Sequence, residues 1–410
     1  MFRKHLSQYT DEELRAEIKR LVDDQVQEGK KLDYKEDVSL DTKNGRREVA
    51  RDTSSFANEI GGAVIYGIPE DRKSDEVAVP IKPYGIQPIR DFEIRAENIC
   101  ADTIAPLLPG LQIRKVDAED VGKVVYVVWH PESWMAPHMV EGYDENRYYR
   151  RGLLRVVRMD EHEVKQKYAQ VQDQLDRVKD LLESPEINFY VAADSGSKTH
   201  IVCCPLMLVP DRVDFSSNSM KQWLAENLAV VGPDAYQWSP SYHGVRASRE
   251  KSYEIRIVGS YCELHRNGAA NYFQDTPLSP PDELLPEDLR GKERFVVMWE
   301  ALAILRDLLR YCGGFYEEIG YYGPLALRLR VTRCAELGFV FSRRRQRRSE
   351  DPVTKYAVLR GVLHIDSFIS GAQLIAEPKS VLKVVADRIS QAFGWWESDG
   401  FDKDLNLIPK

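Results

Sequence analysis

Apolar residues along the first 160 positions recur with two periods, which predicts helices and strands in mixed order. Thr10 and Glu13 form a capping box, and Leu14, Ile18 and Leu21 follow at helical spacing, so we expect a helix over about 10–26. Further helices are predicted over 46–58 and 91–104, and strands over 31–35, 63–68, 124–129 and 148–157. No regular β–α–β rhythm repeats, so the pattern predicts an α+β mixed sheet with helices.

The segment from Glu161 to Glu183 has a different pattern. Its apolar residues step alternately by four and three positions over about three heptads, at Val164, Tyr168, Val171, Leu175, Val178 and Leu182. This predicts one long helix. Two interpretations stay open: a surface helix that packs its apolar stripe on the domain, or a seam between two copies of the chain.

Pro185 ends that helix, and a second α+β domain is expected over 186–410, after a first domain at 1–160 and a helical linker at 161–185. Strands are predicted at 188–191, 201–209, 253–257, 260–264, 325–330, 340–343 and 356–362, and helices at 220–229, 294–311 and 381–393. We expect Gly313-Gly314 to end the apolar helix that begins at 294.

The charge balance and the cysteines narrow the class of protein. The 410 residues contain 57 Lys and Arg against 65 Asp and Glu, which argues against a protein coated in positive charge but allows a local basic groove. No apolar run reaches the roughly 18 to 20 residues of a membrane helix, and no secretory signal is visible, so no membrane association is expected. Six irregularly spaced cysteines are typical of reduced intracellular protein, which predicts a cytoplasmic location.

Acidic residues gather around two of the predicted strands. Asp33 and Lys35 are two apart and project from the same face of one strand, with Glu28 just before it. Glu70 and Asp71 follow the other strand. If the two strands are neighbours, these carboxylates and the lysine converge, and such a cluster holds Mg²⁺ or Mn²⁺ for phosphate chemistry. The alternative is a set of solvated acids at loop edges.

Several motifs in a fixed order extend this interpretation. They are Glu28, Leu32–Glu36, Phe56–Gly62, Val64–Ile68, Ile104–Pro106, Pro137–His138 and Tyr149–Gly152. Together they closely resemble the AlbA_2 or Schlafen-type domain over residues 10–162. The resemblance does not cover 186–410.

The resemblance implies a nucleic-acid-handling domain, and in Schlafen proteins a metal-dependent ribonuclease that acts on tRNA and rRNA through three carboxylates. Carried over by position, these fall on Glu28, Asp33 and either Glu70 or Asp71, with Lys35 at the phosphate. Asp33 stands where the family usually has Glu, and Glu70 where it has Asp, which puts the metal geometry in doubt. The family's clamp has two lobes and only one is recognisable here, which implies a homo-oligomer or a divergent second half.

We therefore expect an endoribonuclease that uses Mg²⁺ or Mn²⁺, favours RNA over DNA and serves antiviral defence. Region 186–410 would position substrate or contact a partner protein. The alternative is a non-catalytic, dimeric DNA-binding regulator. No nucleotide-binding Gly-x4-Gly-Lys-Ser/Thr motif occurs, so NTPase activity is not expected.

Arginines are the remaining candidates for nucleic-acid contact. Arg343, Arg344, Arg345, Arg347 and Arg348 form the strongest charge run, at the tip of a predicted hairpin where they would lie along a phosphate backbone; a solvated loop is the alternative. Arg150 and Arg151 are weaker candidates, because adjacent strand residues face opposite ways and one of them would then be structural.

A zinc site is the last possibility. Cys203, Cys204, Cys262 and His265 supply the right atoms, but the adjacent cysteines point to opposite faces of a strand, so buried thiols are the expected outcome.

Overall fold

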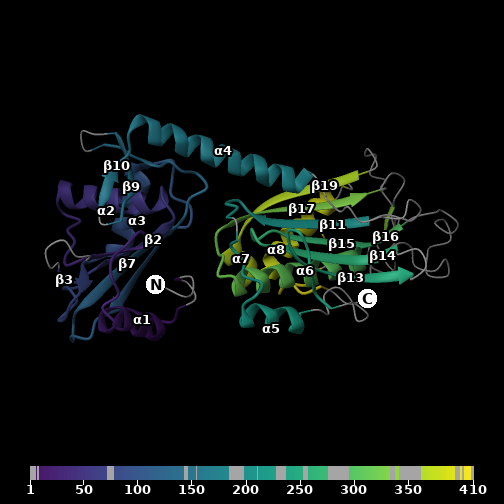
Figure 1. The fold of residues 1–410 in the computed structure, drawn as a ribbon, viewed down its shortest axis with the longest axis horizontal. Helices are drawn as coiled ribbons and strands as arrows, with labels where there is room; N and C mark the ends of the chain where they lie inside the picture. Colours follow the sequence, from purple (N-terminus) through teal and green to yellow (C-terminus); the bar gives the residue numbers. More distant parts are fainter. Residues whose placement is uncertain are drawn as a thin grey trace. The chain divides into compact units, whose positions relative to one another are not determined.

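The structure is a computed structural model. It describes residues 6, 9–71, 78–142, 146–153, 155–183, 198–209, 211–227, 237–252, 257–275, 295–332, 338–340, 362–392, 398 and 401–407. The chain divides into two compact units, Met1–Asp176 and Arg177–Lys410. The division falls within helix α4 (Glu161–Glu183), whose bounds agree with the heptad segment (Figure 1).

A four-stranded sheet forms the centre of the first unit. Its order is β1 (Leu32–Lys35), β2 (Gly61–Tyr66), β7 (Val124–Pro131) and β6 (Gln112–Asp117), and only the β1–β2 pair is parallel. Helix α1 (Asp11–Asp23) packs its apolar stripe on one face. Helices α2 (Lys43–Ala57) and α3 (Phe92–Thr103) cover the other face. The strand β1 lies at the sheet edge, directly beside β2.

Short strands complete this unit. One small sheet has the order β10 (Val156–Arg158), β9 (Arg147–Arg151), β8 (Met139–Val140) and β5 (Ile104–Ala105), and β3 (Glu70–Asp71) pairs with β4 (Val79–Pro80). The single strand predicted over 148–157 is therefore two strands, β9 and β10. The chain reverses between them at Gly152, whose N–H donates to the Arg155 carbonyl at 2.9 Å.

The second unit is built on a seven-stranded antiparallel sheet. Its order is β12 (Ser239–Pro240), β13 (Gly244–Ser252), β14 (Ile257–His265), β15 (Ala270–Asp275), β11 (Lys198–Pro205), β17 (Pro324–Thr332) and β19 (Val362–Ser370). A parallel pair, β16 (Phe295–Val297) and β18 (Gly338–Val340), lies apart from it. The helices are α5 (Asn218–Glu226), α6 (Met298–Glu318), α7 (Gly371–Ala376) and α8 (Pro378–Ala392).

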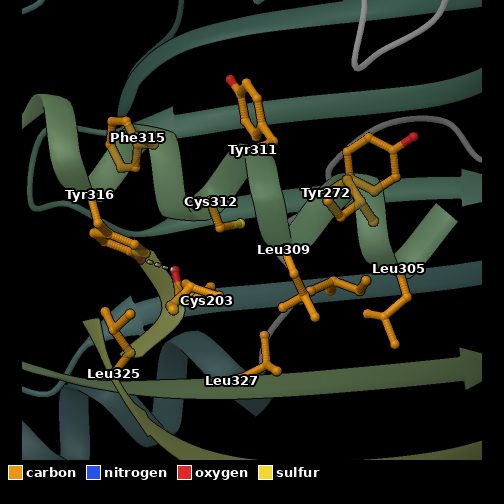
Figure 2. Packing of buried hydrophobic residues seen from close by; sticks show 14 of the residues in the cluster. Cys203, Tyr272, Leu305, Leu309, Tyr311, Cys312, Phe315, Tyr316, Leu325 and Leu327 are labelled. Carbon is orange, nitrogen blue, oxygen red and sulfur yellow. Dashed lines mark hydrogen bonds between the residues drawn. The ribbon is translucent and has the colours of Figure 1, made fainter. Parts of the chain in front are cut away.

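Apolar residues of these helices and of one sheet face form the core of the second unit. Figure 2 shows α6 lying over the strands, with Leu305, Leu309 and Cys312 among the labelled core residues. The Tyr316 hydroxyl donates to the Cys203 carbonyl at 2.9 Å, so even the polar atom of this buried ring is satisfied. Both units combine helices with largely antiparallel sheets, which confirms the α+β class.

Several predicted bounds in this unit are wrong. Residues 295–297, expected at the start of a helix, form strand β16, and helix α6 begins at Met298. Helix α6 does not end at Gly313-Gly314 but continues to Glu318. A Cβ at Gly313 would lie 3.1 Å from the Leu374 carbonyl oxygen, so the glycine accommodates the close approach of α7 instead of breaking the helix. Strand β19 extends to Ser370, beyond the predicted end at 362, and the predicted strands at 188–191 and 356–361 fall outside the described residues.

Among the described residues, the structure contains no helix that is both long enough and apolar enough to span a membrane.

Candidate functional site

Strand β1 directs both of its charged residues toward a covered face of the sheet. Asp33 pairs with Val64 and Lys35 with Tyr66 across the parallel β1–β2 ladder. Val64 and Tyr66 belong to the core beneath α2, so Asp33 and Lys35 lie on that covered face. Asp33 is 2% exposed. A carboxylate buried this deeply requires partners.

Glu28 is one of these partners. Its Oε1 accepts a hydrogen bond from the Tyr34 backbone N–H at 2.9 Å, on a strand whose outer edge is paired with no other strand among the described residues. Its side chain also hydrogen-bonds to the Asp33 carboxyl group. Glu28 is itself 5% exposed, so both acids are buried.

The third acid comes from β3. The Glu28 backbone N–H donates to the Ala78 carbonyl at 3.2 Å, and Ala78 immediately precedes β4, the partner of β3. The negative charge of Glu70 acts on Glu28, whereas Asp71 is exposed. Of the two acids that the sequence left open, Glu70 is therefore the one whose charge reaches Glu28.

Two cations face the Asp33 carboxylate. The Lys35 Nζ lies 2.8 Å from Oδ2, and the Arg151 Nη2 lies 2.7 Å from Oδ1. The Arg151 guanidinium also lies over the Phe56 ring, 5.2 Å from its centroid. Lys35 is only half-buried, so its amine connects the buried acids with the surface.

The protonation of the two acids differs. Burial, followed by the hydrogen bond with Asp33, raises the pKa of Glu28 to about 8. Burial also acts to raise the pKa of Asp33, but the Glu28 hydrogen bond and the charges of Lys35 and Arg151 outweigh it and lower that pKa. The directions of the two shifts favour one proton shared by the pair at neutral pH, held on Glu28 more than on Asp33.

Asp52 is a buried acid that we did not predict. It lies on the covered face of α2, and burial raises its pKa to about 6, with Arg51 opposing the shift and the Asp33 charge adding to it. The sequence carries a signal for it, since Asp52 falls between Val49 and Phe56 at helical spacing on the apolar stripe.

Asn58 fixes the position of β9. Its Nδ2 donates to the carbonyls of His138, at 2.9 Å, and Tyr149, at 2.8 Å, and its Oδ1 accepts from the His138 N–H at 2.6 Å. Asn58 thus fastens the end of α2 to the strand that carries Arg151. The following Gly62 has no room for a side chain, because a Cβ there would collide with the Phe56 ring.

The predicted arginine contacts have different outcomes. Arg151 is 1% exposed and lies inside the domain, so it is a partner of Asp33 and not a surface residue. Arg150 reaches the surface, where its Nε lies 2.7 Å from Glu163 Oε1. The arginine run, Arg343, Arg344, Arg345, Arg347 and Arg348, lies outside the described residues.

The described residues can be examined for groups that could bind a metal ion. In the part of the chain that the structure describes, no group of three or more His, Cys, Asp or Glu is arranged to hold a metal ion. This result applies to the acids near strand β1 and also to the possible zinc ligands Cys203, Cys204, Cys262 and His265. The oxygen donors of Glu28, Asp33 and Glu70 fit Mg²⁺ or Mn²⁺ in kind. A divalent ion there would have to replace the Glu28 proton and compete with the cations on Asp33.

Comparisons with known proteins agree with the motifs. Residues 28–159 match the family described as Schlafen, AlbA_2. No curated protein matches the chain. A solved structure that matches is the N-terminal domain of a protein from Nitrosomonas europaea described as RecG-related, with 19% identity, coverage of 35% of this chain and 90% of that chain, and a TM-score of 0.23. Residues 28–159 of the first unit therefore match a Schlafen AlbA_2 domain, and this match relates that part of the chain to nucleic-acid function.

Proposed function

We propose that the AlbA_2 domain binds RNA and cleaves it with the help of a divalent cation at the cluster of Glu28, Asp33 and Glu70. The observation that carries this proposal is the pair of buried carboxylates, Glu28 and Asp33, at one edge of the sheet, with the charge of Glu70 acting on Glu28 and a half-exposed lysine beside Asp33. A fold has no structural need for such a group, because each buried acid costs desolvation energy.

Each residue has a role in this proposal. Glu28, Asp33 and Glu70 would hold Mg²⁺ or Mn²⁺, which lowers the pKa of a water molecule and neutralises charge on a phosphate. Lys35 contacts a phosphate oxygen, and its ion pair with Asp33 places its amine for that contact. Arg151 acts as a positioning residue that orients the Asp33 carboxylate. Glu28 has to release its proton before it can bind a cation.

The proposed substrate, location and biological role rest on the resemblance to the family. We infer tRNA-like substrates, a cytoplasmic location and a defence role from the resemblance, with Arg150 and the arginine run at 343–348 along the phosphate backbone. A homo-oligomer and a protein partner bound by 186–410 belong to the same proposal.

A second candidate is a DNA-binding regulator without catalysis. The observation that favours it is the buried Arg151, which already occupies one oxygen of the central carboxylate. In that case the acids stabilise the fold, and removing their charge leaves binding intact or strengthens it.

The test is cleavage of a tRNA pool and of single-stranded DNA with Mn²⁺, comparing the full chain with Glu28→Gln, Asp33→Asn and Glu70→Gln. Asp71→Asn is the matched control, since Asp71 is the exposed neighbour of Glu70. We expect cleavage of RNA that the first three substitutions reduce by roughly 100-fold or more, as for loss of a metal-site residue, and that the control leaves unchanged. Salt-sensitive binding without cleavage of either substrate would support the regulator instead.

A further inference from the structure

A row of nitrogen-bearing side chains crosses three strands of the second unit. Ile201, Leu329 and Ile365 belong to the hydrophobic core, so the residues next to them in sequence project from the opposite face of the sheet. Those residues are His200 on β11, Arg330 on β17 and His364 on β19. His200 is paired with Arg330, and Arg330 with His364, so the three side chains lie side by side.

Two nitrogen atoms of this row lack hydrogen-bond partners. His200 is 5% exposed, and within the described part of the chain neither its Nε2 nor the Nε of Arg330 is hydrogen-bonded, although both atoms are buried. Buried polar atoms are satisfied in the great majority of cases, so each exception needs an explanation. Two such atoms on paired residues point to one missing group with several acceptor oxygens.

The nearest acid is already engaged. One step along the same strands, Arg328 binds Asp366 through two hydrogen bonds of 2.6 and 2.8 Å. The charge of Glu183 also acts on Arg328. On the other side of His200 the paired residue is Phe273, which is apolar and buried. Two residues before His200 on β11, Lys198 pairs with Asp275 of β15 in the backbone register.

We propose that His200, Arg330 and His364 form a binding site for a phosphate group, carried by a free nucleotide or by a nucleic-acid backbone. Neighbouring strands are about 4.8 Å apart, so the row spans roughly 10 Å between its outer Cα atoms. An anion with oxygens on several sides can accept from all three side chains, which a carboxylate with two oxygens does less well. All three residues belong to the second unit, whereas the proposed nuclease residues belong to the first.

The protonation of the histidines supports this assignment. Burial, and then the charge of Arg330, lowers the pKa of His200 to about 4. Burial and the two arginines also lower the pKa of His364, with Asp366 opposing them. A bound phosphate would offset the arginine charge and raise both pKa values. Binding therefore takes up protons, and the affinity should increase as the pH falls from 8 to 6.

The experiment is titration calorimetry of the full chain with inorganic phosphate, a nucleoside triphosphate and a short oligonucleotide. Arg330→Gln should weaken binding by roughly tenfold or more, because it removes a charge-assisted hydrogen bond. The matched control is Arg328→Gln, which removes the same charge from the same face and should change the affinity by less than about threefold. Which of the three probes binds most tightly identifies the source of the phosphate.

A second variant tests the site if Arg330→Gln unfolds. Arg330→Met keeps the volume and removes the buried unpaired group, so it should melt at the same or a higher temperature without phosphate and lose the stabilisation that phosphate gives the wild type. Equal losses in the Arg328 and Arg330 variants, or no binding of any probe to the wild type, would overturn the assignment.

Discussion

The Arg151 guanidinium lies 2.7 Å from Asp33 Oδ1, and the side chains of both residues are 2% exposed although they are 118 positions apart in the sequence. Both residues are buried and charged, so each depends on the other to offset its desolvation. This ion pair connects strand β1 with strand β9 and orients the carboxylate at the centre of the proposed site.

Removing the arginine from this pair should be costly. Arg151→Met leaves the buried Asp33 with Lys35 as its remaining cation, and we expect a loss of about 3–5 kcal/mol in unfolding free energy. Arg150→Met is the control, because its partner Glu163 is half-exposed and the expected loss is about 0–1 kcal/mol. Native-state hydrogen exchange of the β1 amides in the full chain measures both, and similar losses in the two variants would contradict the role of the buried pair.

The proton on Glu28 predicts how stability depends on pH. Its folded pKa is raised from 4.5 to about 8, so between these values the folded state holds a proton that the unfolded state has released. Its contribution to stability is therefore lost as the pH rises through that window. Glu28→Gln should flatten the slope between pH 5 and 8, as measured by urea denaturation at each pH. A slope that is unchanged in the variant would show that another group is responsible.

Metal affinity should follow the same proton. If Mn²⁺ replaces the proton of Glu28, the affinity for Mn²⁺ should rise with pH. Below the pKa of Glu28, each increase of one pH unit should raise the affinity by roughly tenfold. Paramagnetic resonance of free Mn²⁺ at pH 6.5, 7.5 and 8.5 measures this without requiring catalysis. Asp71→Asn should retain the dependence and Glu28→Gln should lose it. An affinity independent of pH in the wild type would place any bound Mn²⁺ away from Glu28.

Replacing Asn58 should destabilise the domain and loosen strand β9, which carries Arg151. Asn58→Ala leaves the carbonyls of His138 and Tyr149 without their donor, and we expect a loss of about 2–4 kcal/mol from these buried hydrogen bonds. Asn58→Asp keeps the size and the acceptor oxygen but not the donor, so it should be at least as destabilising. Thermal unfolding measures the loss, and hydrogen exchange at β9 shows whether that strand is loosened first. An unaltered β9 would mean that Asn58 does not hold it.

The sequence by itself determined the local arrangement of the site. A strand period of two puts Asp33 and Lys35 on one face whatever the rest of the chain does, and the capping box at Thr10 starts α1 because both of its hydrogen bonds are local. The motif order also identified the AlbA_2 domain, whose matched residues begin at Glu28.

Tertiary structure decided which face is buried and which distant residues meet there. Local pattern cannot tell Arg150 from Arg151, because the two point to opposite sides and only the packing of β9 against α2 puts Arg151 inside. The same holds for Glu70 and Asp71, since only the folded chain leaves Asp71 exposed and brings the charge of Glu70 to act on Glu28. Protonation was decided in the same way: the pKa of Glu28 depends on burial and on contact with Asp33, and both arise only when the chain is folded.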